Sequence, residues 1–292
     1  MVRTLEAGGL PERAIDKPIA HSGALTLGWA FVQRQTNLWK RYWGWEVVWV
    51  VYGVVNTLAI TFIAKELTQS GLVKGQSASD LVLFLLIGTL VWAYLSAELD
   101  DVSLVVIWER WEGTIEHTLM APVSRTVHLI GMSTFGVLHA LIRTLIIGLI
   151  SLPFFHVDFG GANWLGAISV LLVGSFSVVG LGILTGVLPL IYPERGEQMS
   201  FMMQAVVLLV SGVYYSVDTL PGWLQSVSRF SPATYILRGI RGALIQGKGL
   251  GDLSGDLFLL LVFGVVLIPA SMAVFSAAER WAKKTGRLKR HG

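Results

Sequence analysis

The chain of 292 residues contains no cysteine, and only 14% of its residues are charged, against about 25% in an average soluble domain. The absence of cysteine excludes disulfide bonds, thiolate metal sites and cysteine nucleophiles. The patterns GxxxxGK[ST], HExxH and GxSxG are also missing, so nothing in the sequence supports a nucleotide site or an enzyme active site. His128 and His139 have no evident third ligand, and no metal site is predicted.

Apolar residues dominate instead: 53% of the chain is hydrophobic, and the mean hydropathy is +0.64. A helix needs about 20 residues to cross a hydrocarbon core about 30 Å thick. Six apolar segments have about this length, at roughly 47–64, 81–97, 129–152, 164–191, 199–217 and 257–278. The sequence therefore predicts an all-α integral membrane protein with six transmembrane helices.

The distribution of lysine and arginine predicts that both ends of the chain are cytoplasmic. Six spans place both ends on one side, and the loops on that side would carry most of the Lys and Arg that lie outside the spans. Residues 1–23 are polar, lack the apolar region of a signal peptide and are expected to form a flexible leader. Residues 47–280 would form the six-span domain in the cell membrane, and 281–292 a basic cytoplasmic tail. The net charge of +3 suits membrane flanks rather than nucleic-acid binding.

Two segments next to the spans have a mixed character. Residues 24–46 combine Trp and Tyr with Lys and Arg, which is typical of an interfacial amphipathic helix. This helix would be either an elbow that enters the membrane sideways or an ordinary juxtamembrane anchor. The segment 220–245 contains prolines and arginines and is expected to dip into the bilayer or to lie at its surface.

Charged residues near or within the spans are candidates for lining a pathway. Glu98, Asp100 and Asp101 follow the second span and would form either an acidic lining for a cationic substrate or a solvated or partner-binding helix face. Arg143 lies within the third span, about 13 Å below its outer end, whereas Glu98 lies about 25 Å below. Pairing of Arg143 with the acidic cluster is therefore not expected, which leaves snorkelling to the outer surface or a buried functional role.

The fourth span contains the sequence Gly182-Ile-Leu-Thr-Gly186, which matches the GxxxG pattern. Such a pattern lets the backbone of another helix approach closely, although it is common by chance in a chain with 32 glycines. We interpret it as a packing site.

Two loops carry specific motifs. Between the second and third spans lies E-x-x-E-G-T-x-E followed by A-P-V-S-R, formed by Glu109, Glu112, Gly113, Thr114, Glu116, Ala121, Pro122, Val123, Ser124 and Arg125. Between the fifth and sixth spans lie S-G, L-P-x-W-L, S-P-x-T-Y and a later arginine, formed by Ser211, Gly212, Leu220, Pro221, Trp223, Leu224, Ser231, Pro232, Thr234, Tyr235 and Arg241. Together, in this topology, the motifs resemble those of the permease subunits of type-2 ABC exporters, over residues 25 to 280. Ser231 replaces the usual Asn of that family, Met132 a frequent Lys, and His128 a frequent acid.

The resemblance implies a permease that pairs with a second copy or a homologue and sits on two ABC ATPase subunits. This chain would bind no cofactor, and ATP and Mg would bind in the partner subunit. The resemblance implies a cytoplasmic coupling helix that docks on the ATPase, with the residues Glu109, Arg110, Glu112, Gly113, Thr114, Glu116, Pro122 and Arg125. Glu109, Glu112 and Glu116 are spaced i, i+3, i+7 and would share one helical face, and Pro122 would end the helix. Re-entrant helices would close the outer gate, with the residues Pro221, Trp223, Pro232, Tyr235 and Arg241.

Two other classes of function are open at this point. An ion-coupled carrier could use Arg143 with the cluster from Glu98 to Asp101. A non-transporting scaffold or sensor could bind a cytoplasmic partner through its acidic loop. For an exporter, the compact length suits a drug-like, amphipathic or lipid-like cargo better than a polymer.

Overall fold

The computed structural model describes residues 23–70, 76–121, 123–155, 157, 159–192 and 194–286. The predicted leader 1–23, apart from Gly23, and the last residues of the predicted tail lie outside this part of the chain. The described residues form a bundle of α-helices with two short 3₁₀ turns. The elements are α1 (Ala24–Arg41), α2 (Trp43–Gln69), α3 (Gln76–Trp111), α4 (Ile115–Met120), α5 (Arg125–Ser151), η2 (Leu152–Phe154), α6 (Trp164–Ile191), α7 (Gly196–Ser211), η3 (Val217–Thr219), α8 (Gly222–Ser228), α9 (Pro232–Gln246) and α10 (Leu250–Lys284).

Five of the described helices are long and apolar enough to cross a membrane, which makes the chain a multi-pass membrane protein. The spans are Trp43–Gln69, Asp80–Trp111, Arg125–Phe154, Trp164–Ile191 and Leu250–Lys284. The expected span 199–217 is not among them, because α7 has 16 residues and covers about 24 Å. It ends at Ser211, where Gly212 adopts a left-handed φ of 71° that L side chains rarely tolerate.

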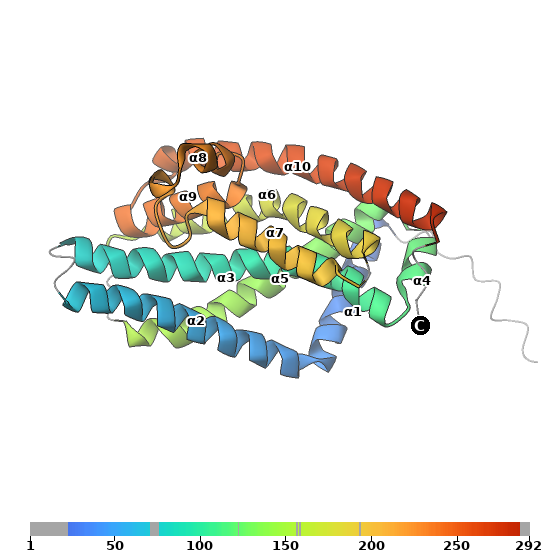
Figure 1. Ribbon diagram of the computed structural model, residues 1–292, viewed down its shortest axis with the longest axis horizontal. Coiled ribbons are helices and arrows are strands. Elements are labelled where there is room, and N and C mark those ends of the chain that lie inside the picture. Colours follow the sequence, from blue (N-terminus) through green and yellow to red (C-terminus); the bar gives the residue numbers. More distant parts are fainter. Residues whose placement is uncertain are drawn as a thin grey trace, which may run out of the picture.

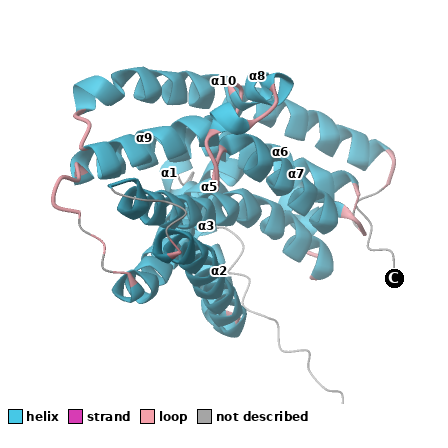
Figure 2. Ribbon diagram, turned by 60° about the vertical axis from the view of Figure 1, so that its left-hand side comes forward, coloured by secondary structure: helices cyan, strands magenta, loops and turns pink. Residues whose placement is uncertain are grey.

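The long helices run along the long axis of the molecule, with α4 at one end and α8 and α9 at the other (Figure 1). Helices α3 and α6 are central: α2 and α5 pack on α3, whereas α9 and α10 pack on α6. Figure 2 shows α10 as the outer layer above α6 and α9. Buried side chains of α3, α6 and α9, among them Tyr94, Val170 and Ile236, form the core between them.

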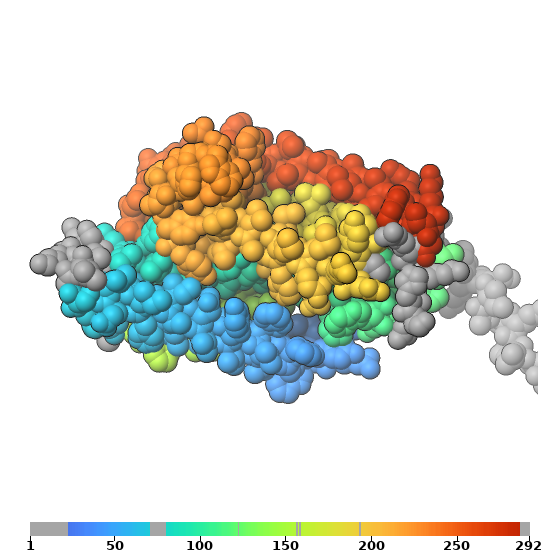
Figure 3. Space-filling model, viewed as in Figure 1, coloured from blue at the N-terminus to red at the C-terminus, as the bar shows by residue number. Residues whose placement is uncertain are grey.

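Helix α2 forms an outer edge of the bundle (Figure 3). Its outward side chains are large and apolar, including Val48, Val51 and Tyr52. Such an edge would be unfavourable in water but suits contact with lipid tails.

The interfacial helix expected over 24–46 is shorter in the structure, where α1 ends at Arg41 and a break separates it from α2. The break lies at Tyr42, and residues 43–46 already belong to α2. Helix α1 packs against α5, so Val32 and Gln35 are buried.

Glycines allow the closest helix contacts, but the tightest lie outside the GxxxG pattern. A Cβ atom at Gly180 would lie 2.6 Å from Leu267 Cβ and 2.9 Å from the Leu267 carbonyl carbon in α10. A Cβ atom at Gly182 or Gly186 would lie 3.4 Å from the nearest atoms of α3, which is an ordinary contact distance. The pattern thus faces α3 loosely, and the close approach of α6 to α10 depends on Gly180.

Candidate functional site

The acidic motif forms a corner rather than one helix. Helix α3 ends at Trp111, and Gly113 turns the chain with a φ of 72°. The amide of Thr114 donates to the Glu109 carbonyl at 2.8 Å, and α4 begins at Ile115. The prediction that Glu109, Glu112 and Glu116 share one helical face is therefore wrong, because Glu109 lies in α3, Glu112 in the turn at Gly113 and Glu116 in α4.

The three acids also differ in their surroundings. Glu109 is 3% exposed and binds Arg34 of α1 at 2.6 Å, and it accepts from the Thr118 hydroxyl at 3.1 Å. Glu112 and Glu116 are exposed on the turn and on α4. Met120, at the end of α4, is 80% exposed. The corner therefore offers two carboxylates and an apolar side chain to a partner, while Glu109 holds α1 to α3.

Helix α4 is fastened to the last span by a group of charges of which Arg125 was predicted, whereas its partners Glu279 and Lys283 were not. Arg125 donates to the carbonyls of Thr118, at 3.0 Å, and of Leu119, and pairs with Glu279 of α10 at 3.0 Å. Lys283 binds the same carboxylate at 2.7 Å and the Leu119 carbonyl at 3.2 Å. The signal in the sequence was Glu279 itself, an acid that directly follows an apolar run. In the structure its side chain faces inward and is 6% exposed.

Two other residues of this loop, Arg110 and Pro122, were predicted to belong to the coupling helix. Arg110 donates to the Leu190 carbonyl at the end of α6. Pro122 lies outside the described residues. Its predecessor Ala121 is extended, with φ −59° and ψ 142°, and α4 ends at Met120.

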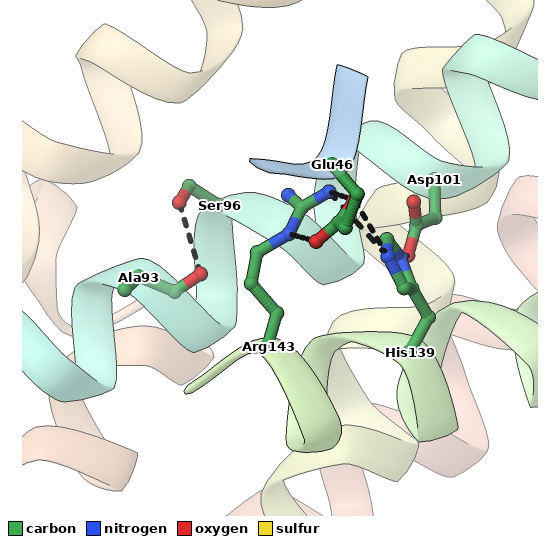
Figure 4. Close-up of polar contacts among 6 residues, drawn as sticks. All are labelled: Glu46, Ala93, Ser96, Asp101, His139 and Arg143. Carbon is green, nitrogen blue, oxygen red and sulfur yellow. Dashed lines mark hydrogen bonds and ion pairs between the residues drawn. The ribbon is translucent and has the colours of Figure 1, made fainter. Parts of the chain in front are cut away.

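A buried cluster of charges joins α2, α3 and α5 (Figure 4). Arg143 binds both carboxylate oxygens of Glu46, at 2.6 and 2.7 Å. His139, one turn away, has Nε2 at 3.1 Å from Glu46 and Nδ1 at 2.8 Å from Asp101. The four side chains are 6–13% exposed. Arg143 is therefore paired inside the protein and does not snorkel outward, and its partner Glu46 was not predicted.

The remaining acids of the predicted lining point elsewhere. Asp100 accepts from Gln204 of α7. Glu98 is 2% exposed, near Tyr94, whose hydroxyl contacts Ser175 of α6. The buried positions of Glu98 and Asp101 contradict a solvated helix face. The structure thus connects Asp101 with Arg143 through His139, whereas Glu98 forms no ion pair within the described part of the chain.

The opposite end of the bundle is organised by Arg241 of α9. Its guanidinium donates to the carbonyls of Gly212 at 2.7 Å, Val213 at 2.5 Å and Phe84 at 3.1 Å, and lies 3.4 Å from the centre of the Phe84 ring. Burial lowers the pKa of Arg241 because the guanidinium loses hydration. One cation therefore holds the end of α7, the start of α3 and α9 together.

The other predicted residues of this end begin or stabilise the short helices. Pro221 precedes α8, and Pro232 is its counterpart at the first position of α9. The Tyr235 hydroxyl donates to the Arg229 carbonyl at 2.9 Å, whereas Trp223 is 69% exposed. A cavity of about 720 Å³ opens between these elements and reaches Arg241.

Comparisons with known proteins agree with the motifs. Residues 26–245 match the family described as ABC-2 type transporter. The chain is 25% identical over 185 residues to the inner membrane transport permease YadH of Escherichia coli K12, covering 63% of this chain and 68% of YadH. It is 26% identical to the probable multidrug ABC transporter permease YbhR of the same organism, over 59% of this chain and 46% of YbhR. It is 29% identical to the daunorubicin resistance permease protein DrrB1 of Streptomyces coeruleorubidus, over 47% of each.

Proposed function

Because this chain belongs to the ABC-2 type transporter family, whose members are membrane permeases without catalytic activity of their own, we propose that it forms half of the pathway of an ATP-driven exporter. A second permease copy or a homologue would supply the other half. Two separate ATPase subunits would bind ATP and Mg and dock on the corner formed by Glu112, Glu116 and α4. The position of this corner, at one tip of the bundle, supports the proposal (Figure 1).

The fastening of α4 supports a coupling role for the corner. Ile115 and Leu119 are buried beneath the helix, and Arg125 and Lys283 bind its last carbonyls. A helix of six residues held at both its apolar face and its carbonyl end moves with α5 and α10. A push from an ATPase would therefore reach two spans directly.

Docking is tested by reversing the two exposed charges. We propose that the ATPase contacts this corner through basic residues. In the variant Glu112→Lys/Glu116→Lys, we therefore expect the ATPase subunit to be lost from the purified complex, because like charges would face each other. Glu66→Lys is the matched control, since Glu66 is exposed near the far end of α2. The test is co-purification from the membrane with equal permease levels. Full retention of the ATPase by the double variant would contradict this docking site.

The proposed topology has six crossings, both termini in the cytoplasm and α8 and α9 at the outer face of the cell membrane. Helix α7 and the residues that follow Gly212 would make the remaining crossing. Helix α1 would lie along the inner interface as the elbow. Because the chain lacks cysteine, single substitutions can report the side. His117→Cys should react with a membrane-impermeant maleimide only in inverted vesicles, and Ser226→Cys only in intact cells. The reverse pattern would contradict this orientation.

The proposed cargo is drug-like, amphipathic or lipid-like. The names of YbhR and DrrB1 refer to multidrug transport and to daunorubicin resistance. For this chain, stimulation of ATPase activity by a panel of amphipathic compounds in the reconstituted complex would test the proposed class.

A further inference from the structure

A cavity of about 260 Å³ lies between α1, α2, α3 and α5, beside the buried charge cluster. Six indole or phenol rings line it, belonging to Trp39, Tyr42, Trp45, Trp49, Trp108 and Trp111. The break between α1 and α2 at Tyr42 brings the rings of both helices to the same cavity. This concentration of rings is more than a simple lipid anchor requires, since they line one half-open cavity.

The rings are held in place before any ligand binds. Tyr42 stacks on Trp108 with ring centres 5.1 Å apart, and Trp108 contacts the edge of Trp111 at 5.6 Å. Trp45 and Trp111 are 61% and 58% exposed, so they stand at the rim, whereas Trp108 lies deeper. A ligand could therefore reach the cavity from the lipid or the interface without unfolding a helix.

The charges that line the cavity favour a cation. Three carboxylates, Glu46, Asp101 and Glu197, stand against Arg143 and His139. Glu46 and Asp101 are occupied by those two side chains. Glu197, in the first turn of α7, is half-buried and forms no ion pair within the described part of the chain. An unpaired carboxylate beside aromatic faces attracts a cation twice, through its charge and through the ring quadrupoles.

We propose that this cavity binds an amphipathic organic cation, such as a quaternary ammonium or phosphonium group with an apolar body. The charged group lies among the rings near Glu197, and the apolar body contacts Leu104 and Val105 of the same cavity. A site for an anion would instead present unpaired Arg or Lys, and Arg143 is already bound to Glu46. The binding of the cation does not depend on the proposed function. The idea that this cation is cargo that enters from the inner leaflet does rest on it.

The first test compares two ions of equal shape and opposite charge on the unmodified protein. The full chain in nanodiscs of zwitterionic lipid is dialysed separately against tetraphenylphosphonium and tetraphenylborate, with empty nanodiscs as the blank. We expect saturable binding of the phosphonium at one site per chain and only the blank level for the borate. Equal binding of both ions, or none of the phosphonium above the blank, would overturn the proposal.

The second test locates the site. Glu197→Gln and Trp49→Leu should each raise the dissociation constant of tetraphenylphosphonium about fivefold, the size of a partly desolvated cation–π or charge contact. Glu194→Gln and Trp164→Leu are the matched controls, because both residues are exposed and do not line the cavity. Equal effects in both pairs would refute the location. Co-purification of the ATPase is measured separately with the unmodified protein. If that protein binds tetraphenylphosphonium but retains no ATPase, the result counts against the proposed function and not against the cation site.

Discussion

The pair of Arg143 and Glu46 gives the sharpest test of the buried cluster. In Arg143→Met, the Glu46 carboxylate, which is only 13% exposed in the unchanged protein, loses its bidentate partner. Removing one member of a buried ion pair costs about 3–5 kcal/mol. Because His139 still contacts Glu46 at 3.1 Å, we expect the lower end of this range.

A loss of about 3 kcal/mol corresponds to a melting temperature lower by about 6–12 °C, at about 2–4 °C per kcal/mol for a large domain. The double variant Glu46→Gln/Arg143→Met removes both charges and should recover most of this loss, since no uncompensated charge is left. Arg238→Met is the control: Arg238 pairs with Asp256, but its side chain is 58% exposed, and it should cost at most about 1 kcal/mol.

The assay is thermal unfolding of the three variants in one detergent, followed by transport after reconstitution with the ATPase. Equal losses for Arg143→Met and Arg238→Met would refute the argument from burial. A double variant no more stable than the single one would refute the pairing. If the double variant is stable but inactive, Arg143 has a role in transport beyond packing, as an ion-coupled carrier would require.

Three further predictions concern packing and coupling. Gly180→Ala should lower the melting temperature, because overpacking against the α10 backbone costs about 1–3 kcal/mol, whereas Gly182→Ala should be neutral; equal melting would contradict the assigned contacts. Glu279→Gln should leave the ATPase bound but reduce ATP-dependent transport, because Arg125, which holds the carbonyl end of α4, loses its ion pair with α10; unchanged transport would exclude that connection. Arg241→Met should increase protease cleavage after Gly212, since three carbonyls lose their donor, and Arg241→Lys should restore protection only in part.

The sequence predicted the membrane class and the positions of the long helices, because lipid demands continuous apolar stretches that one chain displays by itself. It also placed the two loop segments that form α4 and the pair α8 and α9. The errors concern where helices end. Gly113 and Gly212 both adopt positive φ and end α3 and α7 earlier than charge spacing and hydropathy indicated. In such cases a glycine at the end of an apolar run outweighs the side-chain pattern.

The pairs between helices could not be predicted from one sequence. Glu46 and Arg143 are 97 positions apart, and helical spacing says nothing about which spans are neighbours. A partial signal existed, because an acid within the Trp-rich start of a span needs a partner. That partner is Arg143. Its depth in the third span relative to Glu98 does not reveal this pairing, because Glu46 lies on a different helix.

The hydrogen bonds of Arg241 have a consequence for how this end of the bundle can vary in sequence. Its hydrogen bonds end on main-chain oxygens of residues 84, 212 and 213, which every amino acid carries. Apart from Gly212, which needs its positive φ, and Phe84, whose ring lies against the guanidinium, side chains in this region can therefore be exchanged without removing these hydrogen bonds. The surface of this end, which we propose faces the exterior, could therefore change to suit a different cargo while the hydrogen bonds of Arg241 are kept.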